Sequence, residues 1–115
     1  MNKFKNAFDG LKIAINHKAV IIQIVLGICA IIGGIIIKLD YYEWLAFIIC
    51  IGLVIFSEIF NTSIEKIGDY LTDKEDNRIK DIKDLSSAAV LISAITSLIV
   101  CIVVIVRRVI WIKMN

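Results

Sequence analysis

The 115-residue sequence contains no proline and few charged side chains, which make up 21% of its residues. Apolar residues account for 59%, and the mean hydropathy is +0.87. A chain of this length cannot bury so much apolar surface in a core of its own, so lipid must cover much of it. The composition therefore excludes a water-soluble domain and predicts one membrane domain, 1–115. The net charge of +2 gives no reason to expect a nucleic-acid partner.

Motifs that bind metals or phosphate through loops are also missing. The single histidine, His17, has no ligand-spaced partner, and Cys29, Cys50 and Cys101 fall one in each apolar segment. This pattern indicates neither a zinc site nor a disulfide framework, and we expect the cysteines to behave as small apolar residues. The G-x-x-x-x-G-K-[ST] loop and the motif set of soluble kinases are absent. Any nucleotide must therefore bind to helices and their ends.

Three apolar segments are long enough to cross a bilayer. Residues 19–37 carry no charge, and 19 helical residues span a hydrocarbon core of roughly 30 Å. Further spans are predicted at 44–65 and 85–106, separated by a charged cytoplasmic loop at 66–84. The short link 38–43 makes the first two spans an antiparallel hairpin. The sequence thus predicts an all-α membrane protein with three transmembrane helices.

Residues 1–18 precede the first span and predict an amphipathic helix. Phe4, Phe8, Leu11 and Ile15 follow one another at steps of four, three and four, which places them on one helical face. A short basic helix of this kind is typical of the membrane surface; the alternative is a solvated leader docked on the other helices. A cleaved signal peptide is disfavoured, because no small-x-small pattern follows the apolar run.

The distribution of lysine and arginine predicts the orientation of the chain. Nine of these residues lie in 1–18 and 66–84, and four lie in the link 38–43 and after the third span. The positive-inside rule therefore places the N-terminus in the cytoplasm. Aromatic side chains that favour membrane interfaces gather on the opposite side: Tyr41, Tyr42, Trp44 and Trp111.

The second span carries a polar stripe. At 100° per residue, Glu58, Asn61, Glu65 and Asp69 share a helical face about 80° wide. A carboxylate facing lipid costs roughly 2.5–3.5 kcal/mol, so we expect this face to point at other helices, a cation or water. Hydrogen bonding between helices is one interpretation. Three acids in register repel one another, which favours a hard divalent cation such as Mg²⁺.

The third span begins with a second polar feature, Lys83-Asp84. We expect both residues to lie level with Glu65 and Asp69, where a lysine beside bound metal can hold phosphate as a point charge. Alone, such a pair is more typical of a solvated helix end. The row Ala89, Ser93, Ser97 favours close approach of another helix.

These motifs together resemble the small prokaryotic diacylglycerol kinase and undecaprenol kinase family. Residues 58–69 match its pattern E-x-x-N-[ST]-[AS]-I-E-x-x-x-D, and residues 83–90 match K-D-x-x-[SA]-A-A-V. Phe4, Ala7 and Gly10 match its leader, F-x-x-A-x-x-G. The likeness covers nearly the whole chain. It implies a homotrimer in the bacterial inner (cytoplasmic) membrane, with active sites shared between subunits at the cytoplasmic edge.

The resemblance also implies an activity, the transfer of phosphate from Mg-ATP to the hydroxyl of a membrane lipid. Glu58 would be the general base, with Asn61 beside it, and Glu65 would bind Mg²⁺. Lys83 would contact the ATP phosphates, and Asp69 and Asp84 would support the nucleotide end of the site. Whether the lipid is undecaprenol or diacylglycerol stays open, because the spans carry only generic Ile, Val and Leu side chains.

One departure from the family pattern leaves alternatives open. Aligned from Gly10, a metal-binding glutamate of the family falls near position 18, where this chain has Lys18. Glu65 then holds the metal with phosphates and water, or Lys18 replaces part of the charge neutralisation, or activity is weak or lost. This departure also motivates a non-catalytic scaffold derived from the kinases as a rival function. A second rival is an oligomeric transporter or proton relay, since buried acids also mark such pathways.

Overall fold

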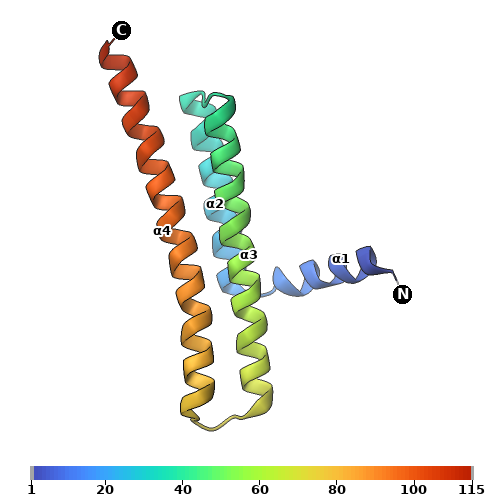
Figure 1. Ribbon diagram of the computed structural model, residues 1–115. Coiled ribbons are helices and arrows are strands. Elements are labelled where there is room, and N and C mark those ends of the chain that lie inside the picture. Colours follow the sequence, from blue (N-terminus) through green and yellow to red (C-terminus); the bar gives the residue numbers. More distant parts are fainter. Residues whose placement is uncertain (1, 115) are drawn as a thin grey trace.

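The computed structural model describes residues 2–114, which form four helices (Figure 1): α1 (Lys3–Ala14), α2 (Lys18–Ile37), α3 (Tyr41–Leu71) and α4 (Asn77–Met114). No strand occurs between residues 2 and 114. Helices α2, α3 and α4 are each long and apolar enough to cross a membrane. The predicted all-α architecture with three spans is therefore confirmed. The predicted homotrimer stays a prediction.

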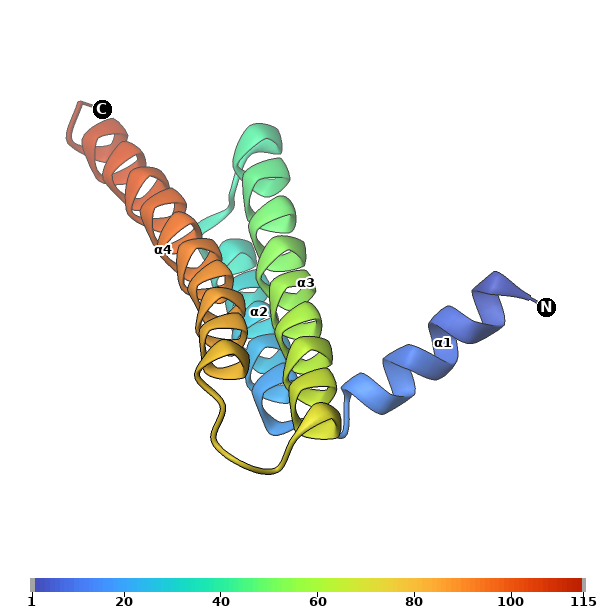
Figure 2. The same ribbon diagram turned by 60° about the horizontal axis from the view of Figure 1, so that its bottom comes forward.

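Helix α1 runs away from the three long helices in both views (Figures 1 and 2). The side chain of Asn2 caps it by accepting hydrogen bonds from the backbone N–H groups of Phe4 and Lys5. The apolar side chains of Phe4, Phe8 and Leu11 are exposed in the chain. The helix ends at the buried Ala14, four residues before the end of the predicted segment 1–18, because a turn at residues 15–17 redirects the chain into α2.

A tight hairpin joins α2 to α3. Lys38 adopts a left-handed conformation with φ of 58°, and the N–H of Leu39 returns to the carbonyl of Gly34, which satisfies the end of α2. A Cβ at Gly34 would lie 2.7 Å from Leu39 Cδ1 and 2.9 Å from Trp44 Cη2. Glycine is therefore required here for close packing of the hairpin. Asp40 and Glu43 then start α3 with a reciprocal capping box.

The link between the second and third spans is much shorter than the predicted loop 66–84. Helix α3 continues to Leu71 and α4 begins at Asn77, so only residues 72–76 are non-helical. The charged residues on either side are compatible with helix, and no proline interrupts them. Both helices therefore extend well past the predicted spans 44–65 and 85–106.

Helices α3 and α4 pack through small and apolar side chains. Phe47 and Val104 form a small buried cluster with Leu39. Ser93 is buried, and Ser97 Oγ donates to the carbonyl of Cys50 at 3.5 Å, as expected for a row of small residues at a helix interface. Most large apolar side chains of the spans are instead exposed, as they must be if lipid surrounds them.

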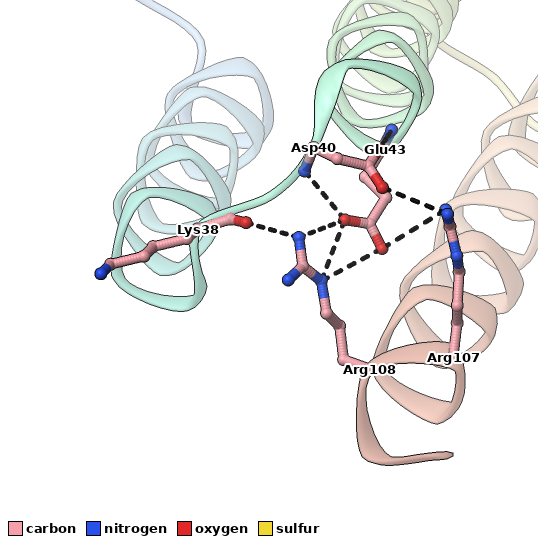
Figure 3. Close-up of polar contacts among 5 residues, drawn as sticks. All are labelled: Lys38, Asp40, Glu43, Arg107 and Arg108. Atoms are coloured by element: carbon pink, nitrogen blue, oxygen red, sulfur yellow. Dashed lines mark hydrogen bonds and ion pairs between the residues drawn. The ribbon is translucent and has the colours of Figure 1, made fainter. Parts of the chain in front are cut away.

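Charged side chains connect the helices where α3 begins and α4 ends, here called the Glu43 end (Figure 3). Arg108 Nη2 lies 2.6 Å from Glu43 Oε1, and its Nε lies 3.0 Å from the same oxygen. Arg107 Nη2 lies 3.2 Å from Asp40 Oδ2, and its Nη1 lies 3.7 Å from Glu43 Oε2. Arg108 also donates to the backbone carbonyl of Lys38. We call Asp40, Glu43, Arg107 and Arg108 the Glu43 cluster.

Candidate active site

The polar stripe of α3 lies toward the other end of the helix and divides into a buried and an exposed half. Glu58 and Asn61 are 6% and 7% exposed, whereas Glu65 and Asp69 lie on the surface of the chain. The expectation that this face turns away from lipid therefore holds for the first two residues within a single chain. One side of the stripe is enclosed by protein and the other is open to a ligand.

Asn61 connects the two halves of the stripe. Its Nδ2 donates to Glu65 Oε1 at 3.2 Å, one helical turn further along α3. Its Oδ1 is buried and has no hydrogen-bond partner among residues 2–114. A buried acceptor without a donor is costly, roughly 1–3 kcal/mol. The Asn61 Oδ1 atom can therefore accept a hydrogen bond from a ligand.

The carboxylate of Glu58 makes no hydrogen bond or ion pair to any residue in the described range 2–114, and the Glu58 backbone carbonyl accepts from Thr62 Oγ1 at 2.9 Å. Unlike Asn61 Oδ1, the Glu58 carboxylate oxygens are not fully enclosed by protein. Glu58 and Asn61 stand three residues apart, on one face of the helix. Within the described residues they form a buried acid without a partner and a buried amide whose oxygen alone is unpartnered. Most buried polar groups in proteins are paired, so this arrangement indicates a binding or reacting site.

Lys83 meets the stripe from α4, as the sequence predicted. Its Nζ lies 2.5 Å from Asp69 Oδ1, a contact between residues 14 positions apart that spans the link 72–76. We call this part of the helix pair the Lys83 end. Gly68 makes the contact possible, because a Cβ there would lie 2.7 Å from Lys83 Cε. Sequence reasoning overlooked Gly68, although a glycine within a polar helical segment was a visible signal.

Asp84 is placed differently from Lys83. Its Oδ2 lies 2.6 Å from Lys80 Nζ, an exposed pair four residues apart along α4. Asp69, Lys83 and Asp84 nevertheless line one polar cavity of about 630 Å³ beside the link 72–76. Small-molecule sites commonly measure ~300–1,000 Å³. The three residues predicted to hold the nucleotide are therefore brought together around one space.

The donor set fits a magnesium ion that arrives with phosphate. No group of three His, Cys, Asp or Glu residues between positions 2 and 114 stands ready to hold a metal. Glu65 offers an exposed carboxylate beside the unpartnered Asn61 oxygen. Mg²⁺ is usually held by one or two carboxylates together with substrate phosphates and water. Lys18, at the start of α2, supplies no carboxylate ligand for the metal.

Comparison with known proteins assigns the chain to a family. A model of the prokaryotic diacylglycerol kinase family matches residues 5–105. This three-span helical membrane protein with a polar site at one end of its spans therefore belongs to the prokaryotic diacylglycerol kinase family.

One curated relative is similar over a shorter stretch. Undecaprenol kinase from Bacillus subtilis (strain 168) is 36% identical over 73 residues, which cover 63% of this chain and 59% of that protein. The match thus spans less than two thirds of the relative's length. No solved structure matches the chain.

Proposed function

We propose that this chain is a lipid kinase that transfers phosphate from ATP to the hydroxyl of a membrane lipid, undecaprenol or diacylglycerol. The observation that carries the proposal is the pairing of two sites at one end of α3 and α4. Glu58 and Asn61, whose Oδ1 atom has no partner in residues 2–114, lie buried in the span, and the cavity lined by Lys83 and Asp69 lies at its polar edge. A lipid hydroxyl would reach the first site from the bilayer, and a soluble nucleotide would reach the second from water.

Phosphoryl transfer requires the protein mainly to position the reactants and to neutralise phosphate charge. In this proposal Glu58 accepts the proton of the lipid hydroxyl as the oxygen attacks the γ-phosphorus of ATP, and ADP leaves. The Asn61 Oδ1 atom would accept a hydrogen bond from the hydroxyl or from protonated Glu58. Lys83 would orient the phosphates, supported by Asp69 and Asp84. Magnesium held by Glu65 would neutralise phosphate charge when bound.

An apolar groove supports a lipid as the acceptor. The groove measures about 550 Å³, runs between α3 and α4, and is lined mostly by apolar side chains, among them Leu53, Phe56 and Phe60. Ser57, the neighbour of Glu58, also lines it. A lipid chain lying in this groove would bring its headgroup toward the polar edge of the spans.

The proposal includes a location and an assembly. The N-terminus and the Lys83 end would face the cytoplasm of a bacterium, where ATP is available, with α1 on the membrane surface. Because Glu65 and Asp69 are exposed in one chain, a neighbouring chain in a homotrimer can complete the site. A transporter is less well supported, because Glu43, the buried acid at the opposite end of α3, is engaged by Arg108.

The test is transfer of radiolabelled γ-phosphate by the purified protein in mixed micelles. Undecaprenol and diacylglycerol are offered separately with ATP and Mg²⁺, and chelation of Mg²⁺ serves as the matched control. We expect label in at least one lipid, and loss of that label on chelation. Absence of transfer to either lipid would overturn the proposal and favour a scaffold.

A further inference from the structure

Polar cross-links join α3 and α4 at both ends of the pair. Glu43 meets Arg108 at one end, and Asp69 meets Lys83 at the other. Glu43 and Asp69 lie 26 residues apart on α3 (43 to 69), and Lys83 and Arg108 lie 25 residues apart on α4 (83 to 108). At about 1.5 Å per residue these separations are roughly 39 and 38 Å. Both cross-links therefore belong to the same register of the two antiparallel helices.

Few polar contacts lie between the two ends. One hydrogen bond from Ser97 to the Cys50 carbonyl crosses there from α4 to α3 within the described residues. The buried cluster of Phe47 and Val104 adds apolar contacts. In lipid, such contacts gain no hydrophobic driving force. Sliding α4 by one helical turn, about 5.4 Å, would break both cross-links.

The two cross-links are unequal. The side chain of Glu43 is 2% exposed, so losing its partner would leave a carboxylate buried without a counter-charge. The side chain of Asp69 is 72% exposed, and water can replace Lys83 there. The Glu43 cluster therefore has the larger influence on register, and the Lys83 end follows it.

We infer that Glu43 and Arg108 are positioning residues that set the register of α4 on α3 and so hold Lys83 opposite Asp69. The role of Lys83 toward ATP rests on the proposed function; the register itself does not. Arg108 lies beyond residues 5–105, the part of the chain that the family model matches. Arg107 also lies beyond the matched residues, whereas Asp40 and Glu43 lie within them.

The test uses the full-length chain in lipid nanodiscs, with Cys29, Cys50 and Cys101 replaced by alanine. Spin labels are attached at Tyr70→Cys and Asp81→Cys, two exposed positions near the Lys83 end. Labelled chain is diluted with unlabelled chain, so that pulsed electron paramagnetic resonance reports the distance within one molecule. The kinetics of lipid phosphorylation are measured on the same variants without labels.

Four variants separate register from general damage. Glu43→Gln removes the charge yet keeps an oxygen that can accept from the Asp40 N–H, a bond of 2.9 Å in the native chain. Arg108→Gln removes the other partner, and Arg108→Lys is the conservative rescue. Lys113→Gln is the matched control, because Lys113 is an exposed cation near the same end of α4 that lies outside the Glu43 cluster.

We expect Glu43→Gln and Arg108→Gln to add a second distance population displaced by several ångströms. The KM for ATP should rise about tenfold, with a smaller loss of kcat at saturating ATP. Lys113→Gln should match the native chain, and Arg108→Lys should lie between the native chain and Arg108→Gln. Unchanged distances in Glu43→Gln and Arg108→Gln would overturn the register claim, even if the chain proves to have no kinase activity. Shifted distances with an unchanged KM for ATP would overturn the positioning of Lys83.

Discussion

The two ends of the α3–α4 pair use similar charged side chains in different ways. At the Glu43 end, a carboxylate with 2% exposure is held by Arg108 and Arg107, and its neighbour Asp40 is also paired. At the Lys83 end, Asp69 is largely exposed, and the Asn61 Oδ1 atom nearby has no partner in the described chain. The closed end satisfies its charges within the fold. The open end leaves polar groups available, as a binding site requires.

The largest expected effect comes from Glu58→Gln, which keeps the size of the side chain and removes the proposed base. We expect kcat for lipid phosphorylation to fall by about 10²–10⁴-fold, the usual contribution of general base catalysis. Thermal stability should change little, because the Glu58 carboxylate has no ion pair in residues 2–114 to lose. The measurement is kcat at saturating ATP and lipid, together with the melting temperature of each variant.

Two variants make this result specific. Asp81→Asn removes an exposed acid of α4 that lines none of the cavities described above, and it should keep native activity. Glu43→Gln neutralises the other buried acid of α3 and should lose far less kcat than Glu58→Gln. Equal losses in kcat at positions 43 and 58 would erase the distinction between a structural and a catalytic end.

The next largest effect concerns stability. Arg108→Ala should lower the free energy of unfolding by about 2–3 kcal/mol, at or just below the range of about 3–5 kcal/mol for breaking a fully buried pair, because Arg108 is 27% exposed. Lys83→Ala should cost less than about 1 kcal/mol, since its partner is mostly in water. Reversible unfolding in mixed micelles measures both. A larger loss for Lys83→Ala would reverse our assignment of the two ends.

Matched glycine substitutions should give different kinds of effect at the two ends. Gly68→Ala pushes against the flexible stem of Lys83, with a Cβ 2.7 Å from its Cε, so the KM for ATP should rise about threefold, roughly 0.7 kcal/mol. Gly34→Ala meets Leu39 and Trp44 in the hairpin and should instead cost about 1–3 kcal/mol of stability. ATP kinetics and unfolding of both variants would show whether each glycine serves its own end.

The difference between the ends also decides what the sequence could predict. The spans follow from runs of apolar residues, and the shared face of Glu58 and Asn61 follows from helical periodicity. Which stripe residues are buried depends on where α2 and α4 pack, and no local pattern contains that information. The segment 66–84 was predicted as a loop because it is densely charged, yet charged residues outside a membrane can continue a helix.

The Glu43 cluster was overlooked for a related reason. Glu43 and Arg108 lie 65 positions apart on two different helices, so helical periodicity cannot predict that they pair. Asp40 and Glu43 did carry a local signal, since Asp at the N-cap with Glu three residues later is a capping box. The Asp84–Lys80 pair was also readable, at the four-residue spacing of helix surfaces. Local pairs were thus predictable, and the long-range register was not.

The smallest effect we expect is a pH dependence at the closed end. The backbone N–H of Glu43 donates to Asp40 Oδ1 at 2.9 Å and lowers the pKa of the Asp40 carboxyl from its usual 3.8, and Arg107 acts in the same direction. A carboxyl with a lowered pKa stabilises the folded state fully above its unfolded pKa, and this contribution is lost as the pH falls through the folded value.

The melting temperatures of Asp40→Asn and the native chain should therefore differ by a constant amount between about pH 8 and pH 5. This difference should shrink below about pH 4. The difference should be small throughout, because asparagine is also a good N-cap. Asp76→Asn, in the link at the Lys83 end, should show the same direction of change, since the Arg78 side chain lowers the pKa of Asp76. Added salt should weaken the Asp76 effect more, because the Arg78 side chain is the largest cause of the lowered pKa of Asp76, whereas a backbone hydrogen bond is the largest cause for Asp40. Equal salt sensitivity of the two aspartates would contradict this difference in cause.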